Sequence, residues 1–516
     1  MSATKLAHSI LRNLLELGVT HFVLSPGSRN APFSLALHEA SERGLSDLHV
    51  RIDERGAAFY ALGISKATEN YVAVICTSGT AAANYHPAAL ESYHSRTKVI
   101  FITADRPSRL RETGANQTTL QNNLLSPVKC HDINSPIDIS SLLDGGPIHL
   151  NVQFDEPLIS PVKEEWFAGI KVEPYFHEDF ELRDVEAQPR SAIIIGHDKG
   201  GFSDGEIEDF LADCELPVIA EDPLTTFDSV PHASLFLADP EIRKALKADQ
   251  LFVIGRTTLS RSINAYISEC ENITVIDPRL DNVDRRRDAQ TKLSALPFIG
   301  GEQNEDWLSI WDSLLDIEIP VDRWSEQQAI LAIVENIPEG SALFIGSSRP
   351  VRDIEALAQF RPGIRTFSNR GLAGIDGNIS TAFGISKLFQ KSYSIMGDLT
   401  FLHDISALAN QVESDHCIFV IDNNGGGIFS TLPQAGSEGF ENVFGTPHNL
   451  DLEKIAQGFG VKVSRVKSSS DILLQINQTG LRIVVIEVPS REENAAYLKE
   501  LYQSAAKAAR IGINLA

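Results

Sequence analysis

Two apolar runs in the C-terminal part of the chain constrain its fold more than any other feature of the sequence. Residues 392–396 read SYSIM and are followed by Gly397 and Asp398, and residues 416–421 read HCIFVI and are followed by DNNG. The residues between the two runs have the pattern of a short helix. Two strands joined through a helix lie parallel in one sheet, so their carboxyl ends meet at the same edge, where ligands of such sheets bind. The pattern therefore predicts a ligand site at this edge.

The side chains at that edge suit a divalent cation. Asp398 and Asn423 lie 25 positions apart (423 − 398) and would face one another. A carboxylate oxygen, an amide oxygen and a nearby backbone carbonyl, here assigned to Gly425, form a hard oxygen set of the kind that binds Mg²⁺. Because Mg²⁺ held by few protein oxygens completes its shell with water and phosphates, the set also predicts a phosphate ligand.

The residues around Asp398 extend this interpretation to a diphosphate group. Gly397 permits close approach of the backbone, and Leu399 and Thr400 offer an amide and a hydroxyl. The alternative is that GD and DNNG only end two buried strands, as turn residues often do. Either half alone favours that alternative, whereas both halves at this spacing favour a metal–diphosphate site.

Length and composition limit the class of protein. A chain of 516 residues is too long to fold around one ordinary hydrophobic core, and this length predicts about three domains. Five scattered cysteines without CxxC spacing argue against a disulfide framework or a zinc site and favour a reducing, cytoplasmic location. The formal net charge of −24 argues against nucleic acid or an anionic membrane as a partner, and no stretch resembles a membrane span.

Short apolar runs alternate with helical patterns along the chain, which predicts α/β domains with doubly wound parallel sheets. We expect a first domain over 1–160, a linker over 161–188, a middle α/β domain over 189–322 and a last domain over 323–516. Strands are expected at 21–24, 49–52, 72–76, 99–103 and 148–152, at 192–195, 217–220, 251–254 and 273–276, and at 342–345, 392–396, 417–421 and 483–488. Helices are expected at 5–17, 33–43, 57–68, 81–93 and 492–510. The middle domain lacks a GxGxxG after its first strand, which argues against a nicotinamide dehydrogenase.

Gly-Asp followed about 25 residues later by Asn-x-Gly resembles the cofactor motif of thiamine-diphosphate (ThDP) enzymes. Four further stretches narrow the resemblance: SPGSR from residue 25, DRP…GANQ from residue 105, SNRG…GIDG from residue 368 and NNGGGIF from residue 423. Together with GDLTFLHD they resemble MenD, the family of 2-succinyl-5-enolpyruvyl-6-hydroxy-3-cyclohexene-1-carboxylate synthases of menaquinone biosynthesis. The resemblance covers the first and last domains and implies a pyrimidine-binding, a middle and a diphosphate-binding domain of the ThDP-binding fold type.

The resemblance implies a transferase of the carboligase type that requires ThDP and Mg²⁺ or Mn²⁺. In the implied reaction 2-oxoglutarate loses CO₂, and the succinyl-semialdehyde unit that remains adds to isochorismate. A homodimer or homotetramer is also implied, because in this superfamily the catalytic glutamate and the diphosphate site lie on different subunits.

Glu54 is the candidate catalytic residue. ThDP must lose a proton from its thiazolium ring, and a carboxyl group that engages the aminopyrimidine ring from a dry site promotes this step. A glutamate between a strand end and a helix, in the sequence DERG, fits this placement. The alternative is an acid in the first turn of a helix, where the helix dipole favours it. By itself the residue favours that alternative; together with the GD…NN motif it favours catalysis.

The implied substrates carry two carboxylates each, so an acidic protein must gather arginines locally to bind them. Carried over position by position, the resemblance assigns substrate contacts to Ser28, Arg29, Arg106, Asn116, Gln117, Ser348, Arg352, Arg370 and Phe429. Ser348 and Arg352 are four positions apart and would share one face of a helix. Ile375 matches the bulky residue that supports the bent cofactor, and Ile428 matches an apolar wall near the reacting centre. Taken singly, each arginine would be a solvated surface charge.

The sequence departs from the family pattern at two places. Asp422 stands where an asparagine is common, and Asn30 follows SPGSR where serine is commoner. Two alternatives are another ThDP carboligase or decarboxylase and, in a different functional class, a subunit without catalytic activity. An acetolactate-synthase-like enzyme acting on pyruvate would not need a second carboxylate contact. A catalytically silent subunit of the same fold would be expected to lose Glu54, Asp398 or Asn423, and all three are present.

Overall fold

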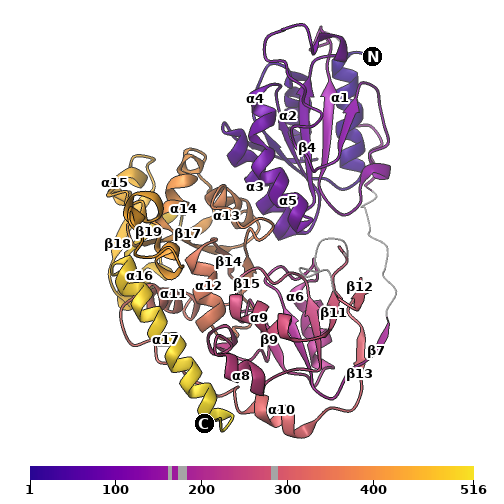
Figure 1. Ribbon diagram of the computed structural model, residues 1–516. Coiled ribbons are helices and arrows are strands. Elements are labelled where there is room, and N and C mark those ends of the chain that lie inside the picture. Colours follow the sequence, from indigo (N-terminus) through magenta and orange to yellow (C-terminus); the bar gives the residue numbers. More distant parts are fainter. Residues whose placement is uncertain (161–164, 173–182, 280–288, 516) are drawn as a thin grey trace. The chain divides into compact units, whose positions relative to one another are not determined.

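The computed structural model describes residues 1–160, 165–172, 183–279 and 289–515 (Figure 1). Among the described residues, three large parallel sheets of six, five and six strands and one small sheet of two strands, with helices between the strands, confirm the predicted α/β class. The chain forms two compact units. The first unit contains residues 1–178, 371–390 and 401–414, and the second contains residues 179–370, 391–400 and 415–516. The expected boundaries of the three domains stay a prediction.

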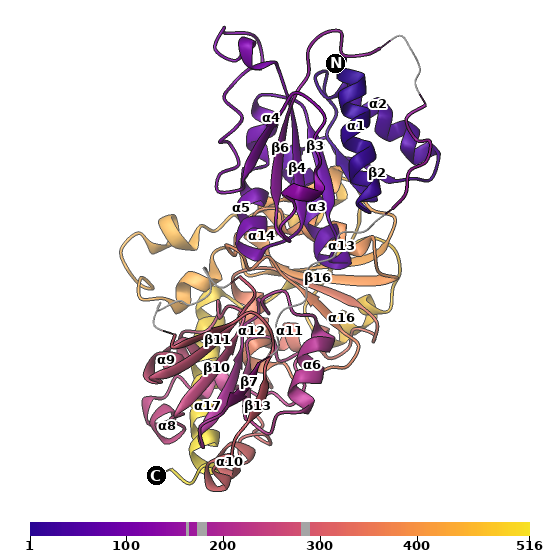
Figure 2. The same cartoon turned by 90° about the vertical axis from the view of Figure 1, so that its right-hand side faces the viewer.

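The first unit contains a sheet of order β2-β1-β3-β4-β6-β5. Its strands are β1 (His21–Leu24), β2 (Asp47–Val50), β3 (Val72–Cys76), β4 (Val99–Asp105), β5 (Cys130–Ile133) and β6 (Ile148–Gln153). Its helices are α1 (Ala3–Glu16), α2 (Ala31–Glu42), α3 (Glu54–Thr68), α4 (Thr80–Asn84), α5 (His86–Ser95) and α13 (Asn378–Ser386), with short turns η1 (Ser108–Leu110), η2 (Ser140–Leu142) and η3 (Ile405–Ala409). Helices α1 and α2 bury their apolar sides against one face of the sheet (Figure 2).

Helix α13 packs closely against α3, although the two helices lie far apart in the sequence. At the crossing, a Cβ atom on Gly63 would lie 2.1 Å from the carbonyl oxygen of Thr381. Only glycine permits this approach of two backbones. A late segment of the chain therefore completes the unit that the N-terminal residues begin.

The second unit contains the other two large sheets and the two-stranded sheet β13-β7. The five-stranded sheet has the order β12-β11-β10-β8-β9, and the six-stranded sheet has the order β15-β14-β16-β17-β19-β18. The middle segment contains β7 (Asp184–Glu186), β8 (Ser191–Ile195), β9 (Val218–Ala220), β10 (Gln250–Ile254), β11 (Asn272–Ile276), β12 (Thr291–Leu293) and β13 (Phe298–Gly300), with α6 (Asp204–Ala212), α7 (Ala233–Phe236), α8 (Pro240–Ala245), α9 (Arg261–Glu269) and α10 (Glu305–Asp312).

The C-terminal sheet and its helices complete this unit. The strands are β14 (Ala342–Ile345), β15 (Arg365–Phe367), β16 (Lys391–Gly397), β17 (Asp415–Asp422), β18 (Lys462–Val466) and β19 (Arg482–Glu487). The helices are α11 (Glu326–Val334), α12 (Arg349–Leu357), α14 (Asp398–His403), α15 (Leu452–Gln457), α16 (Ser469–Ile476) and α17 (Arg491–Gly512), with turns η4 (Gly427–Thr431) and η5 (Glu441–Gly445). Helix α17 shares a core with α7 and α8 (Figure 1), so the middle segment and the C-terminal segment are packed together.

Two expected elements are wrong in detail. The helix expected at 81–93 is two helices, α4 and α5, which meet at Tyr85. Pro87 lies in the first turn of α5 and has no N–H to continue the α4 helix. The strand expected at 49–52 ends at Val50, because the chain turns there so that Asp53 can cap the N-terminus of α3. The expected linker, 161–188, lies partly outside the described residues; its described end contains β7, which pairs with β13.

Cys76, Cys130, Cys214, Cys270 and Cys417 are all free thiols. In the part of the chain that the structure describes, no helix combines the length and the apolar composition that a bilayer crossing requires.

A buried histidine in the C-terminal sheet predicts a pH dependence of stability. His416 lies between the hydroxyls of Ser392 and Ser394, and burial, with a smaller contribution from Arg482, lowers its pKa to about 3 from the usual 6.5. Below pH 6.5 the unfolded chain gains a proton at this residue while the folded chain does not. The stability that His416 contributes is therefore lost as pH falls, by up to about 1.4 kcal/mol per pH unit.

We expect the cost of His416→Gln to shrink as the pH is lowered. Urea unfolding of wild type and variant at pH 7.5, 6.5 and 5.5 measures this difference in free energy of unfolding. His38→Gln is the control, since His38 is exposed. A cost of His416→Gln that stays constant with pH would contradict the prediction.

Candidate functional site

The predicted ligand edge of the C-terminal sheet is present in the second unit. Strands β16 and β17 are parallel neighbours, with Gly397 in register with Ile421, and α14 begins directly at Asp398. The Asp398 side chain is buried, and its carboxylate accepts the N–H groups of Leu399 at 2.6 Å and Gly425 at 2.8 Å. The two predicted loops thus meet at one carboxylate.

Asn423 lies two residues before Gly425, whose N–H binds this carboxylate, and its amide is held from one side. Its Nδ2 donates to the Glu326 carboxylate at 2.5 Å. Its Oδ1 is buried and has no hydrogen-bond partner among the described residues. A buried amide oxygen without a partner costs free energy unless a ligand binds it. The Asn423 oxygen and the Asp398 carboxylate are therefore suited to a hard divalent cation, and the donor set fits the cation that the sequence predicts.

Two residues near Asp398 were not assigned to a site by the sequence analysis. His448 Nε2 lies 3.2 Å from Asp398 Oδ2 and 3.9 Å from an oxygen of Asp422. The potential ligand atoms of these three residues all lie within 4.8 Å of one another. The hydrogen bond to Asp398 raises the pKa of His448, and Arg465 pairs with Asp422 at 3.3 Å. No local spacing links His448 to the GD and NN motifs, so sequence pattern alone had no signal for it.

Other residues assigned to the cofactor surround this edge. Thr400 is buried in α14, two residues after Asp398. Ile428 and Phe429 lie in η4 and are half-buried, and the Phe429 ring packs against Phe444 with 5.5 Å between ring centroids. Apolar side chains therefore line the chain directly after the Asn423 loop.

A group of arginines lies at the carboxyl ends of β14 and β15 in the same unit. Ser348 caps the N-terminus of α12, and Arg352 donates to its carbonyl oxygen at 2.6 Å, so the structure brings these two predicted residues together. Burial, with a smaller contribution from Arg349, lowers the pKa of Arg352. Arg370 is also buried and lies within 3.4 Å of the Ser347 hydroxyl. The buried Arg370 guanidinium and the half-buried Arg352 guanidinium are suited to an anionic ligand.

The middle segment contributes to this group, which the sequence analysis did not expect. Thr258, in the loop after β10, accepts a hydrogen bond from Arg370 Nε at 3.2 Å. Arg256 in the same loop donates to the Arg370 carbonyl oxygen at 2.8 Å. The five-stranded sheet thus holds a predicted substrate residue in place.

The remaining predicted arginines lie in the first unit. Arg106 Nη1 donates to the Ser78 hydroxyl at 3.0 Å and to the carbonyl oxygen of Gln117 at 2.8 Å. Arg29 donates to the carbonyl oxygen of Phe154 at 3.1 Å. Burial and the positive charge of Arg29 lower the pKa of Arg106, so the two guanidinium groups are neighbours. The structure brings Arg29, Arg106 and Gln117 together.

The exposed residues of this region lie in loops. Ser28 is exposed next to Arg29, and Asn116 and Gln117 are exposed in the loop after η1. Ile375 belongs to the same unit and is half-buried. It follows a segment held by Glu91, whose carboxylate accepts the N–H groups of Gly371 at 2.7 Å and Leu372 at 2.8 Å. Glu91 thereby fixes the backbone that leads to Ile375.

Glu54 is the first residue of α3. Asp53 caps the helix, with its carboxylate accepting the N–H groups of Arg55 and Gly56. The Glu54 side chain is half-buried. Burial, and to a smaller extent the nearby Glu54 carboxylate, raises the pKa of the Cys76 thiol at the end of β3. This position is compatible with both interpretations of Glu54, the catalytic one and the helix-terminal one.

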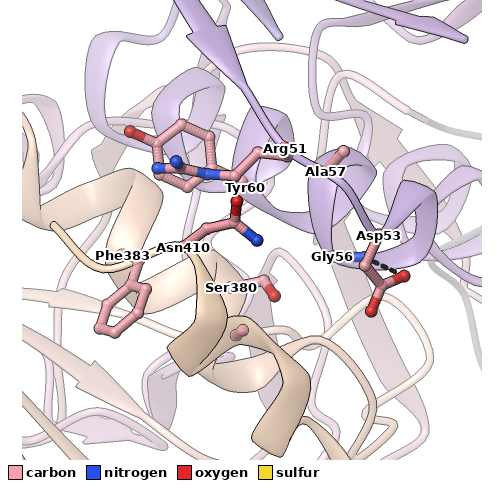
Figure 3. A pocket seen from close by; sticks show the side chains of 9 residues that line it. Arg51, Asp53, Gly56, Ala57, Tyr60, Ser380, Phe383 and Asn410 are labelled. Atoms are coloured by element: carbon pink, nitrogen blue, oxygen red, sulfur yellow. Dashed lines mark hydrogen bonds between the residues drawn. The ribbon is translucent and has the colours of Figure 1, made fainter. Parts of the chain in front are cut away.

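Figure 3 shows a small pocket in the first unit, beside the start of α3. Residues of α3 line one side of it, and α13 and the segment 407–410 line the other. The lining residues are Arg51, Asp53, Gly56, Ala57, Tyr60, Ser380, Phe383, Ala407 and Asn410. The Arg51 guanidinium lies 4.1 Å above the Tyr60 ring. Glu54 does not line this pocket, which is distinct from the predicted site.

Comparison with known proteins identifies both ends of the chain as cofactor-binding domains. The family described as thiamine pyrophosphate enzyme, N-terminal TPP binding domain, matches residues 4–125. The family described as thiamine pyrophosphate enzyme, C-terminal TPP binding domain, matches residues 352–488. These ranges include β1 to β4 of the first sheet and β15 to β19 of the last sheet, with the Asp398 and Asn423 loops.

Relatives that match over nearly the whole chain carry one name. The 2-succinyl-5-enolpyruvyl-6-hydroxy-3-cyclohexene-1-carboxylate synthase of Saccharopolyspora erythraea is 34% identical, covering 95% of this chain and 96% of the relative. The synthase of the same name from Nocardioides sp. is 33% identical, covering 97% of both chains. That from Geobacillus thermodenitrificans is 31% identical, covering 95% of this chain and 94% of the relative.

A solved structure supports the arrangement of the fold. The crystal structure of benzoylformate decarboxylase from Polynucleobacter necessarius matches with a TM-score of 0.66 and 16% sequence identity, covering 95% of this chain and 99% of that chain. At this identity the match supports the fold alone.

Proposed function

The chain belongs to the MenD family, the 2-succinyl-5-enolpyruvyl-6-hydroxy-3-cyclohexene-1-carboxylate synthases of menaquinone biosynthesis, and on this premise we propose how its residues carry out the reaction. It is a transferase that joins 2-oxoglutarate to isochorismate with loss of CO₂. The observation that carries this conclusion is the similarity to synthases of one name over nearly the whole length of both chains.

We propose that ThDP is the organic cofactor, with Mg²⁺ or Mn²⁺ beside its diphosphate. When bound, ThDP supplies a carbon nucleophile for the keto group of the donor and accepts the electrons that decarboxylation leaves behind. The Asp398 carboxylate, the Asn423 amide oxygen and the Gly425 backbone carbonyl would hold the cation. The buried, unpartnered Asn423 Oδ1 beside buried Asp398 supports this assignment.

Further residues of the chain would position the cofactor. The Leu399 amide and the Thr400 hydroxyl would bind the diphosphate next to Gly397, and Ile375 would support the bent cofactor, with Ile428 forming an apolar wall. Glu54 would engage the aminopyrimidine ring and so promote proton loss from the thiazolium ring. Its position at the start of α3, with Asp53 holding the helix terminus, supports a fixed position of its backbone.

The arginines would bind the carboxylates of the two substrates. Arg29 and Arg106, with Ser28, Asn116 and Gln117, form one candidate group, and Ser348, Arg352 and Arg370 form the other. Because Arg370 is buried and Arg352 is half-buried, a carboxylate that enters there makes strong charge-assisted hydrogen bonds. Phe429 would exclude water from the apolar part of the site.

One assay tests the function as a whole. The purified protein with ThDP and Mg²⁺ is given 2-oxoglutarate and isochorismate, and CO₂ release and isochorismate loss are followed in the same tube. We expect loss of isochorismate that requires both the 2-oxo acid and ThDP. Use of pyruvate as the donor, with isochorismate untouched, would favour an acetolactate-synthase-like carboligase instead.

We propose that the enzyme is a homodimer in which Glu54 and the diphosphate site of one active centre come from different subunits. Glu54→Gln and Asp398→Ala, each inactive alone, should then complement one another after subunit exchange. Random exchange makes half of the dimers hybrid, each with one intact centre, so roughly a quarter of wild-type activity is expected. Differently tagged variants that co-purify as hybrids and yet stay inactive would contradict shared active centres.

A further inference from the structure

Glu326 fixes the direction in which Asn423 presents its amide oxygen. An amide side chain has a donor end and an acceptor end, which are nearly equal in shape and opposite in chemistry. A carboxylate accepts hydrogen bonds, so the Glu326 carboxylate selects the Nδ2 end of Asn423, and the two atoms lie 2.5 Å apart. The Oδ1 end must then point the other way, where it is buried without a partner among the described residues.

Glu326 is itself held firmly at the start of α11. It is buried, 3% exposed, and its backbone N–H donates to Asn494 Oδ1 at 3.0 Å. Ser325 caps the helix one residue earlier. The glutamate therefore has a fixed backbone from which its carboxylate reaches Asn423.

The Gly427 backbone lies close to the contact between Asn423 and Glu326 and leaves no space for a side chain. A Cβ atom there would lie 2.4 Å from Asn423 Nδ2 and 3.5 Å from Glu326 Oε1. Any side chain at this position would displace the amide from the carboxylate. Glycine in the NNGGG sequence thus preserves the contact between Glu326 and Asn423.

We propose that Glu326 is a positioning residue for the cation site: it orients the Asn423 amide so that Oδ1, and not the NH₂ group, faces the cation. This inference rests on the proposed role of Asn423 as a cation ligand. Outer-shell partners of metal ligands act in this way, and their loss typically costs about 10- to 100-fold in metal affinity. Glutamine at 326 can donate or accept, so it no longer selects one orientation of the amide.

Cation binding, and not turnover, is the direct test. Free Mn²⁺ is measured by electron paramagnetic resonance during titration of wild type, Glu326→Gln and Glu335→Gln, each with ThDP present. Glu335 is the matched control, because it caps the other end of α11 and is exposed. We expect Glu326→Gln to bind Mn²⁺ about 10- to 100-fold more weakly and Glu335→Gln to match wild type. Affinity of Glu326→Gln within twofold of wild type would overturn the proposal.

A double variant distinguishes a loss of cation affinity caused by the wrong orientation of the residue 423 side chain from a loss caused by a general disturbance of the fold. In Asn423→Asp both ends of the side chain accept hydrogen bonds, and a carboxylate then faces the Glu326 carboxylate. Adding Glu326→Gln restores a donor to the contact, so the double variant should bind Mn²⁺ more tightly than Asn423→Asp alone. Equal affinities of these two variants would overturn the proposal, even where Glu326→Gln alone does not fold. Wild type that binds no Mn²⁺ with ThDP would instead refute the proposed cation site.

Discussion

Glu54→Gln is expected to lower turnover by on the order of 10²- to 10⁴-fold, the range that a positioned acid–base group contributes. Glutamine keeps the size and the helix position of the side chain but removes the carboxyl group that engages the aminopyrimidine ring. ThDP and the divalent cation should still bind, because the proposed diphosphate and cation ligands are other residues. Steady-state rates, together with ThDP binding followed by tryptophan fluorescence, measure the two effects separately.

The control for Glu54→Gln is Glu69→Gln, the same chemical change at the exposed C-terminus of the same helix. It should leave turnover within the error of the assay. Full activity of Glu54→Gln would remove this residue from the mechanism and leave it as an acid in the first turn of α3.

Asp398→Ala should abolish cation-dependent binding of ThDP, and turnover with it. The Asp398 carboxylate accepts the Gly425 N–H and lies beside Asn423, so its loss removes a ligand and loosens the loop that carries the others. The drop in cation affinity should exceed the roughly 10- to 100-fold that loss of an outer-shell partner causes. Calorimetric titration of Mg²⁺ in the presence of ThDP measures it.

Asp422→Asn distinguishes two ligand sets around Asp398. The set proposed here contains Asp398, Asn423 and Gly425, whereas the side chains that cluster in the structure are Asp398, Asp422 and His448. Under the proposed set, Asp422→Asn changes cation affinity only a few-fold. A loss as large as that of Asp398→Ala, seen with both Asp422→Asn and His448→Ala, would assign the cation to the second set.

The central strands could be predicted from the sequence because both of their faces are buried. The residues of β3 are all apolar and all buried, and the expected range, 72–76, is the observed one. Edge strands were missed: β5, β15 and β18 are partly exposed and mix charged with apolar residues, so no continuous apolar run marks them. Strand prediction from apolar runs thus succeeds where a strand is buried, as in the edge strand β9, and fails where an edge strand is partly exposed and carries charged residues.

The same contrast applies to the candidate site. Asp398 and Asn423 could be found because each directly follows a buried strand, and neighbouring parallel strands bring their ends together. The partners that hold these and other site residues come from distant parts of the chain. His448 lies 50 positions from Asp398, Glu326 lies 97 from Asn423, and Thr258 lies 112 from Arg370. Such contacts depend on tertiary packing, which local spacing does not encode.

The close packing of α13 on α3 has a consequence for synthesis of the protein on the ribosome. The N-terminal sheet and α3 emerge first, but the helix that covers α3 begins only at Asn378, and the segment 401–414 of the same unit follows later still. Until then the nascent chain presents the apolar surface of α3 to the solvent. Exposed apolar surface on an incompletely folded chain promotes aggregation and recruits chaperones. The first unit therefore cannot complete its folding until α13 and the segment 401–414 have been translated.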